Sequence, residues 1–339
     1  MSIKPKILII EEGFLRKDIE FYLNSVDFEA KLISLNPNIQ IKSNKYLDKI
    51  LNIYNRVVKK NIYYFEEKSI KYKNRFYLNQ IKKEIEFLNF DYILLIVPYH
   101  YSSQVINYLS KHTNKIIGYS WDSINNKKEH QLIKFNNKIS KLFCYDKNSI
   151  NNFTKLNLIY TTNFYYPLEE IEIYKNTTRP VNKISYVGNL ADRRDVVIEE
   201  ILDNIEGKVE YDINIVKHDF KQSLLKDKYK FNYLEAGISL HDYMKITLNS
   251  EIILDIQLGW QNGFTFRIIE ASYLKKKIIT TNQFATELKF YHPDNIFIYN
   301  EETKHLLNDF SLKPYTEIDS SLIEYYRIDN WLKRILELE

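Results

Sequence analysis

The chain has 339 residues, of which 45% are hydrophobic and 27% are charged. This is enough apolar material for two domain cores, and it excludes global disorder. A net charge of +4 is too small by itself to predict binding to nucleic acid, and a single cysteine excludes an internal disulfide and a cysteine-rich metal site.

The sequence also argues against export. Nowhere does it approach the roughly 18 consecutive apolar residues of a membrane-spanning helix. Its start leads directly into an apolar run, without the hydrophobic region of a secretion signal. We therefore expect a cytoplasmic protein, with Cys144 buried in the apolar run 141–145.

The first half of the sequence alternates short apolar runs with helical patterns. Each run has the length and continuous apolar character of a strand buried on both faces of a parallel sheet. The predicted strands are residues 6–10, 91–98, 115–119 and 141–145. Alternating strands and helices predict a doubly wound, Rossmann-like α/β domain over residues 1–166.

Residues 42–90 combine helical periodicity with positive charge. Twelve Lys and Arg stand against five Asp and Glu, an excess of +7 (12 − 5), and aromatic residues lie between them. Two interpretations are open. The region is either a solvated helical face or a surface for an anionic membrane or a lipid-linked acceptor.

The second half repeats the alternation after a polar, irregular stretch at residues 167–182, which we predict to be a linker. A second Rossmann-like domain is expected over residues 183–322, followed by a C-terminal helix over 323–339 that could cross back to the first domain. The predicted strands are 183–187, 211–216, 251–257, 277–281 and 296–299, and the predicted helices are 195–205, 241–248 and 266–274. Two such domains would place a cleft at the carboxyl ends of their strands.

The segment from Trp260 to Ala271 follows a predicted strand and opens a helix. Gly263 permits a tight turn, and the helix start offers N–H groups and a partial positive charge that favour a diphosphate. Glu270 lies one turn into the helix, where a carboxylate can accept hydrogen bonds from the two hydroxyls of a ribose. Arg267 either forms an ion pair with Glu270 or contacts a phosphate.

This segment resembles a motif of many GT-B glycosyltransferases. In that motif a glutamate precedes Gly-Phe, and a second glutamate followed by Ala stands eight positions after the first. Asn262, Gly263, Phe264, Glu270 and Ala271 occupy that register. The resemblance implies that Glu270 binds the donor ribose. It also implies that an amide, at Asn262, replaces the carboxylate that would contact the transferred sugar.

Two further stretches are similar to glycosyltransferases of the spore-maturation protein group (CgeB-like). They are residues 184–194, with a glycine and then two arginines, and residues 118–122, which end in Trp-Asp. Gly188 allows the backbone to approach a phosphate, and Arg193 or Arg194 can supply countercharge, the other being a solvated residue at a helix start. The predicted donor-binding residues are Gly188, Asn189, Arg193, Arg194, Gln261, Asn262, Gly263, Phe264, Thr265, Arg267 and Glu270.

Two signatures of other enzyme classes are missing. No Asp-x-Asp triplet occurs, the metal-binding pair of the other large glycosyltransferase fold, and there is no glycine fingerprint of a dinucleotide-binding domain. We therefore expect neither a metal nor a cofactor. A nucleoside diphosphate sugar would be the co-substrate.

The catalytic candidates follow strands of the first domain. His100 can take up a proton near neutral pH and act as a base, or it can be a satisfied loop residue. Asp122, which the resemblance covers, is either a catalytic or acceptor-orienting group or the N-cap of the next helix. Glu11 and Glu12 stand at a third strand end.

These features predict a glycosyltransferase that moves a sugar from a nucleoside diphosphate to a saccharide or lipid-linked acceptor. The expected setting is bacterial surface polysaccharide synthesis (capsule, O-antigen or lipopolysaccharide), in the cytoplasm or peripherally at the inner face of the membrane. Two alternatives are a nucleotide-sugar epimerase of the same fold and a catalytically silent scaffold. An epimerase would convert its donor without an acceptor. Retention and inversion are both open.

Overall fold

The chain folds into two compact units. The computed structural model describes residues 4–15, 17–40, 45–167, 183–207, 209–216, 228–235 and 237–338. Unit 1 comprises Met1–Thr161 with Leu332–Glu339, and unit 2 comprises Thr162–Trp331. The division after Thr161 comes five residues before the expected domain end at residue 166 (166 − 161). The predicted linker lies outside the described residues, apart from Pro167.

Unit 1 is built on a parallel sheet of six strands in the order β2-β1-β3-β4-β5-β6. The strands are β1 (Lys6–Glu11), β2 (Glu29–Ser34), β3 (Tyr92–Ile96), β4 (Ile116–Ser120), β5 (Lys141–Cys144) and β6 (Leu158–Tyr160). Ile7 to Ile10 of β1 are at most 2% exposed, as expected for a strand covered on both faces. Cys144 is buried and forms no disulfide, as predicted.

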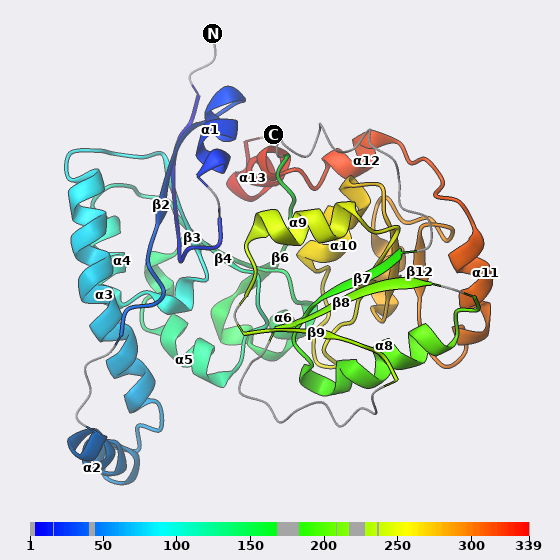
Figure 1. The fold of residues 1–339 in the computed structure, drawn as a ribbon. Helices are drawn as coiled ribbons and strands as arrows, with labels where there is room; N and C mark the ends of the chain where they lie inside the picture. The colour runs from blue at the N-terminus through cyan, green and yellow to red at the C-terminus, as the bar shows by residue number, and fades with distance from the viewer. Residues whose placement is uncertain are drawn as a thin grey trace. The chain divides into compact units, whose positions relative to one another are not determined.

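The helices of unit 1 flank this sheet (Figure 1). They are α1 (Asp18–Ser25), α2 (Lys45–Val57), α3 (Tyr64–Ile85), α4 (Ser103–Leu109), α5 (Asn126–Ile133) and α6 (Lys147–Asn152), with 3₁₀ turns η1 (Pro98–His100), η2 (Asn136–Lys138) and η3 (Thr154–Leu156). Helix α3 buries Tyr77, Ile81 and Ile85 on one stripe, as an amphipathic helix on a sheet does. Helix α2 lies at the start of α3, away from the sheet.

Unit 2 contains a second parallel six-stranded sheet, in the order β12-β11-β10-β7-β8-β9. Its strands are β7 (Lys183–Gly188), β8 (Glu210–Val216), β9 (Asn232–Leu234), β10 (Ile252–Asp255), β11 (Lys277–Thr280) and β12 (Ile296–Ile298). Two clusters of buried hydrophobic side chains pack this unit, one containing Ile198 of α8 and the other Ile268 of α10. The two doubly wound sheets confirm the predicted fold class.

The helices of unit 2 are α8 (Arg194–Asp203), α9 (Leu240–Leu248), α10 (Phe266–Tyr273), α11 (Leu307–Leu312) and α12 (Ser320–Glu324), with turns η4 (Ala191–Arg193), η5 (Gln283–Glu287) and η6 (Lys304–Leu306). Helix α13 (Ile328–Leu336) starts in unit 2 and ends in unit 1. The last helix runs into the C-terminal residues that cluster with unit 1.

The C-terminal segment differs from the single helix that the sequence predicts. Helix α12 ends at Glu324 and α13 begins at Ile328. Between them the backbone of Tyr165 donates to Tyr326 at 2.9 Å and accepts from Ile328 N at 2.8 Å. This short β-bridge takes the backbone groups that a continuous helix would use internally, so the helix breaks.

Both sheets reverse their strand order once. In unit 1 the reversal lies between β1 and β3, and in unit 2 it lies between β7 and β10. Loops that follow two such neighbouring strands diverge to opposite faces of the sheet, which opens a crevice at the carboxyl ends. These two points are where ligand sites are expected.

Candidate functional site

In unit 2 the predicted donor-binding residues gather at the reversal between β7 and β10. Strand β7 ends at Gly188 and leads into Asn189, while β10 ends at Asp255 and leads toward α10. Two segments far apart in the sequence therefore meet at one sheet edge. Ligands of open α/β sheets bind at this kind of position.

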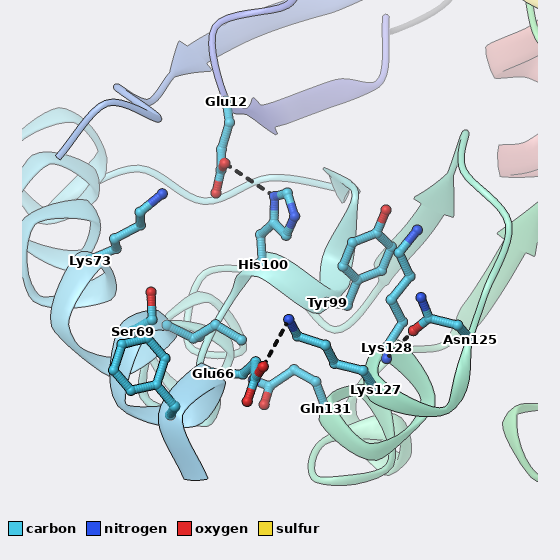
Figure 2. A pocket seen from close by; sticks show the side chains of 12 residues that line it. Glu12, Glu66, Ser69, Lys73, Tyr99, His100, Asn125, Lys127, Lys128 and Gln131 are labelled. Atoms are coloured by element: carbon cyan, nitrogen blue, oxygen red, sulfur yellow. Dashed lines mark hydrogen bonds and ion pairs between the residues drawn. The ribbon is translucent and has the colours of Figure 1, made fainter. Parts of the chain in front are cut away.

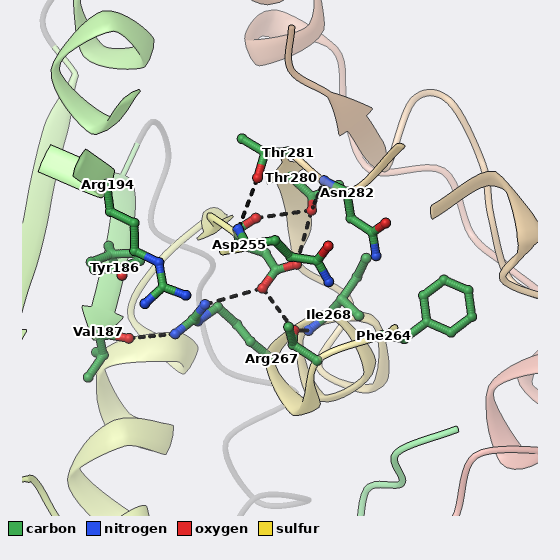
Figure 3. Close-up of polar contacts among 12 residues, drawn as sticks. Tyr186, Val187, Arg194, Asp255, Phe264, Arg267, Ile268, Thr280, Thr281 and Asn282 are labelled. Carbon is green, nitrogen blue, oxygen red and sulfur yellow. Dashed lines mark hydrogen bonds and ion pairs between the residues drawn. The ribbon is translucent and has the colours of Figure 1, made fainter. Parts of the chain in front are cut away.

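Asp255 is the centre of a buried polar network that sequence reasoning did not identify (Figure 3). Its side chain is fully buried. Oδ1 accepts from Thr265 Oγ1 at 2.8 Å and lies 3.2 Å from Arg267 Nη1, while Oδ2 accepts from Thr280 Oγ1 at 3.0 Å. A buried carboxylate needs such partners, so the network fixes the start of α10 against β10 and β11.

Arg267 joins β7 to this network. Its Nη2 donates to the carbonyl of Val187 at 2.6 Å, and its guanidinium lies 5.1 Å from the centre of the Tyr186 ring. The alternative of an ion pair with Glu270 is wrong, because the guanidinium reaches Asp255 at the end of β10 instead. Its Nε is buried and has no hydrogen-bond partner among the described residues, so one donor of the guanidinium is not used by them.

The start of α10 is capped and held in place. Thr265 is the N-cap, and its Oγ1 accepts from the backbone N–H of Ile268 at 3.3 Å. The carbonyl of Gly263 accepts from Asn282 Nδ2 at 3.1 Å and from the side chain of Gln257. Two side chains, those of Gln257 and Asn282, therefore hold the loop that precedes α10 at Gly263.

The other predicted residues of this loop differ in exposure. The side chain of Phe264 is 3% exposed and packs in the hydrophobic core, so it contributes packing at this position. Gln261 and Asn262 are half-buried, and the backbone of Gln261 donates to Leu258 at 2.9 Å. Both side chains are amides, and the Asn262 Oδ1 atom is buried.

Glu270 lies within α10 and is 6% exposed. Burial raises its pKa to about 8, while Tyr243 and Arg267 lower that pKa in part. Perturbed carboxyl groups of this kind are concentrated at functional sites. Tyr243, from α9, is a neighbour of Glu270 that sequence reasoning missed, because the two residues belong to separate helices.

The loop after β7 places one of its two arginines toward the site. Asn189 Oδ1 accepts from Arg194 Nη1 at 2.8 Å, and Tyr186 Oη donates to the Asn189 carbonyl at 2.9 Å. The Arg193 side chain is 66% exposed and lies 3.6 Å from Asp195. Arg193 therefore fits the solvated residue expected at the helix start, and Arg194 is the better placed cation.

The structure shows why residue 188 is a glycine. A Cβ at this position would lie 2.6 Å from Tyr186 Oη, closer than side chains pack. The Tyr186 ring is buried and holds the Asn189 loop, so the glycine permits the close approach of a tyrosine of its own strand.

Unit 1 contains a pocket of about 520 Å³ beside the reversal between β1 and β3 (Figure 2). Residues after β1 and β3 form part of its wall, and the first half of α3 and the start of α5 form the rest. The lining residues are Glu12, Phe65, Glu66, Ser69, Ile70, Lys73, Tyr99, His100, Asn125, Lys127, Lys128 and Gln131.

His100 lies beside Glu12 at one wall of this pocket. The Nδ1 atom of His100 lies 3.1 Å from Oε2 of Glu12, and Figure 2 shows the pair at the pocket wall. Asn74 Nδ2 donates to the His100 carbonyl at 2.8 Å, which fixes the backbone there. The imidazole side chain is 43% exposed, so it is accessible to a molecule in the pocket.

Asp122 lies next to the pocket and positions two of its lining residues. Its Oδ2 accepts from Tyr99 Oη at 2.9 Å and lies 3.8 Å from Lys128 Nζ, which in turn lies over the Tyr99 ring at 4.5 Å. The alternative role as a helix cap is wrong. Asn125 caps α5 by accepting from Lys128 N at 3.0 Å, because the helix begins at Asn126.

The structure thus brings the predicted residues together in two groups, one in each unit. Asp255, Tyr243 and the α3 wall of the pocket were not predicted. A signal existed only for Asp255, which is a charged residue directly after the apolar run 252–254. The others depend on which helices pack side by side.

Two further properties bear on the chemistry. In the part of the chain that the structure describes, no three His, Cys, Asp or Glu side chains gather as a metal site would require. Among the described helices, none has both the length and the apolar character needed to cross a membrane.

Comparisons with solved structures show the same fold over nearly the whole chain. A trehalose-6-phosphate synthase, OtsA, has a TM-score of 0.60 at 12% identity, with 98% of each chain covered. An α-glucosyltransferase (AGT) in complex with UDP has a TM-score of 0.52 at 11% identity, covering 97% of this chain and 94% of the other. The lipopolysaccharide outer core galactosyltransferase WaaB has 0.51 at 13%, covering 98% and 99%.

These likenesses establish the two-domain GT-B fold. No protein-family model and no curated protein sequence matches the chain. The narrower resemblance to the spore-maturation protein group therefore stays a hypothesis.

Proposed function

We propose that the protein is a cytoplasmic glycosyltransferase that moves a sugar from a nucleoside diphosphate to a saccharide or lipid-linked acceptor. The expected setting is the synthesis of a bacterial surface polysaccharide. One observation carries the proposal. At the strand reversal of unit 2, a buried carboxyl group at Glu270 lies in the helix whose Arg267 donates to the Val187 carbonyl, near the end of the strand that leads to Asn189 and Arg194.

Each part of this arrangement matches one part of a nucleotide donor. The carboxylate of Glu270 would accept hydrogen bonds from the two ribose hydroxyls, which replace the water lost on burial. The start of α10 and the guanidinium of Arg194 would stabilise the diphosphate, the leaving group of the reaction. Gln261 and Asn262 would contact the transferred sugar. With these groups supplying the positive charge, we propose transfer without a metal ion.

Unit 1 would bind the acceptor in the pocket beside β1 and β3. His100 is the proposed base. Its Nδ1 lies 3.1 Å from Oε2 of Glu12, and a neighbouring carboxylate can orient an imidazole that acts as a base. The acceptor hydroxyl would transfer its proton to Nε2 while its oxygen attacks the anomeric carbon, and the bond to the diphosphate breaks. A base of this kind suits inversion at the anomeric carbon.

A screen of nucleotides and nucleotide sugars by thermal shift tests the donor site, because ligands that bind only the folded state raise the melting temperature. We expect one nucleoside diphosphate to give the largest shift. Glu270→Ala should weaken its binding by about 1 to 3 kcal/mol, the cost of leaving polar groups unpaired. Glu302→Ala, in an exposed turn of the same unit, is the control.

The same purified protein and variants also distinguish the three proposed functions. If no nucleoside diphosphate binds, or if Glu270→Ala binds as tightly as the wild type, the donor site is wrong. Incubation with the donor alone separates transfer from isomerisation, since only an epimerase would convert the sugar without an acceptor. Binding of a nucleotide sugar with no transfer to any acceptor tested, and no conversion of the sugar, would indicate a catalytically silent scaffold.

A further inference from the structure

Helix α2 turns its apolar side outward. The side chains that face the rest of unit 1 are polar, with Asp48 and Asn55 at most 7% exposed and Asn52 half-buried. These residues are spaced by four and three positions and so share one face of the helix. A helix that packs on a protein core shows the opposite arrangement.

One ion pair ties α2 to α3 in this orientation, and local hydrogen bonds satisfy the buried Asn55. Asp48 forms an ion pair with Lys68 of α3. Asn55 Nδ2 donates to the carbonyl of Leu51 at 2.7 Å, and the Asn55 carbonyl accepts from Asn61 N at 2.9 Å. A rotation of α2 that buried its apolar side would break the ion pair with Lys68, which joins α2 to α3.

The outward side is a continuous apolar surface, here called the α2 face. Its members recur with the helical period, and each is more than 40% exposed. They are Ile50 (64%), Leu51 (41%), Ile53 (55%), Tyr54 (48%), Val57 (72%) and the following Val58 (61%). Monomeric proteins rarely expose so many contiguous large apolar side chains without a partner for them.

The charges around the α2 face have one sign. Lys49, Arg56, Lys59 and Lys60 are exposed. Asp48 is the only acidic residue in the sequence from 45 to 60, and its carboxylate is paired with Lys68. Within residues 45–60, a surface that approaches this helix therefore meets four exposed cations and one carboxylate that is already paired.

We propose that the α2 face docks on an anionic lipid bilayer, with the apolar side chains at the acyl boundary and the basic residues at the phosphates. An amphipathic helix with a basic polar side binds such a surface by apolar burial and by attraction to anionic headgroups. A second copy of the chain fits less well. Pairing two α2 faces would bring the same four cations together. The proposal concerns where the protein acts and stands independently of the reaction proposed above.

Vesicle sedimentation tests the proposal. The full chain is mixed with vesicles of phosphatidylcholine alone, or of phosphatidylcholine with phosphatidylglycerol, and the bound fraction is measured. We expect binding to the mixed vesicles only. Ile50→Glu/Ile53→Glu places two charges in the α2 face and should lower the partition coefficient at least about tenfold. Phe21→Glu, at a residue of α1 that is 71% exposed, should leave it unchanged.

The charge requirement is tested separately. Lys49→Gln/Arg56→Gln should weaken binding to the mixed vesicles, whereas Lys71→Gln/Arg75→Gln, at exposed residues of α3, should have a smaller effect. Circular dichroism and nucleotide binding of each variant show whether it is folded. The proposal is overturned by three outcomes: no binding to either vesicle, equal binding to both, or wild-type binding by Ile50→Glu/Ile53→Glu. A dimer in analytical ultracentrifugation that this variant dissociates would assign the face to a second copy.

Discussion

Asp255 Oδ1 lies 3.2 Å from Arg267 Nη1, and the Asp255 side chain in this ion pair is fully buried. Removing the charge of Asp255 would leave the guanidinium with one carbonyl partner in a buried environment. We expect Asp255→Asn to lower the free energy of unfolding by about 3 to 5 kcal/mol. Urea denaturation of the purified protein measures the change.

The control for this substitution is Asp203→Asn. Asp203 also forms an ion pair, with Lys228, but both side chains are largely exposed to solvent. Solvated ion pairs contribute about 1 kcal/mol or less. If the two variants lose similar stability, the buried network is not what fixes the start of α10.

The buried carboxyl group of Glu270 predicts a dependence of stability on pH. Its pKa is about 8 in the folded protein against 4.5 for the ordinary side chain. Between these values the folded state binds more protons than the unfolded state, so stability falls as pH rises from about 4.5 to about 8. A shift of this size corresponds to about 5 kcal/mol, an order-of-magnitude figure.

Glu270→Gln should remove this part of the pH dependence. Without bound nucleotide, the variant is expected to be more stable than the wild type at about pH 9, and to lose that advantage near pH 5. Unfolding curves at both pH values measure the difference, with Glu302→Gln as a control that keeps the wild-type profile. Equal slopes for wild type and Glu270→Gln would show that burial does not shift this group.

The contact between His100 and Glu12 predicts a catalytic effect. His100→Ala should lower kcat by about 10² to 10⁴, the usual contribution of a general base, with little change in the KM for the donor. Glu12→Gln should reduce kcat by less, because it removes the orienting group and keeps the imidazole. His305→Ala, an exposed histidine of unit 2, should have wild-type kinetics. A change confined to the KM for the acceptor would instead make His100 a binding residue.

The close approach at Gly188 predicts a steric cost. A methyl group there would lie 2.6 Å from Tyr186 Oη, so Gly188→Ala must displace a buried ring. We expect a loss of about 1 to 3 kcal/mol in the free energy of unfolding. Gly237→Ala is the matched control, since no atom lies within 4 Å of its added methyl group. Its effect should be small or stabilising, through the unfolded chain.

The sequence predicted the periodic elements well. The continuous apolar runs at 6–10 and 91–98 identified β1 and β3 because a strand covered on both faces has no polar position. Three strands were missed, β2 (Glu29–Ser34), β6 (Leu158–Tyr160) and β9 (Asn232–Leu234). Three residues, as in β6 and β9, carry no usable period. The C-terminal helix was predicted without its break, because the bridge from Tyr165 is a long-range contact.

The site was only partly accessible from the sequence. The Gly-Phe and Glu positions before and within α10 could be recognised because a loop and a helix start have local signatures. The same reasoning offered Glu270 as the partner of Arg267, because both lie on one helix face. The structure pairs Arg267 with Asp255, since β10 and α10 meet only after the sheet has formed.

The sequence by itself determined the longer periodic strands and helices and the helical period of the basic region 42–90, because these properties depend on residues a few positions apart. Tertiary structure alone decided which strand ends are neighbours, that Glu12 faces His100, and that the apolar side of α2 points outward. Those outcomes depend on strand order and on the pairing of buried polar groups between distant segments. Local periodicity contains no information about either.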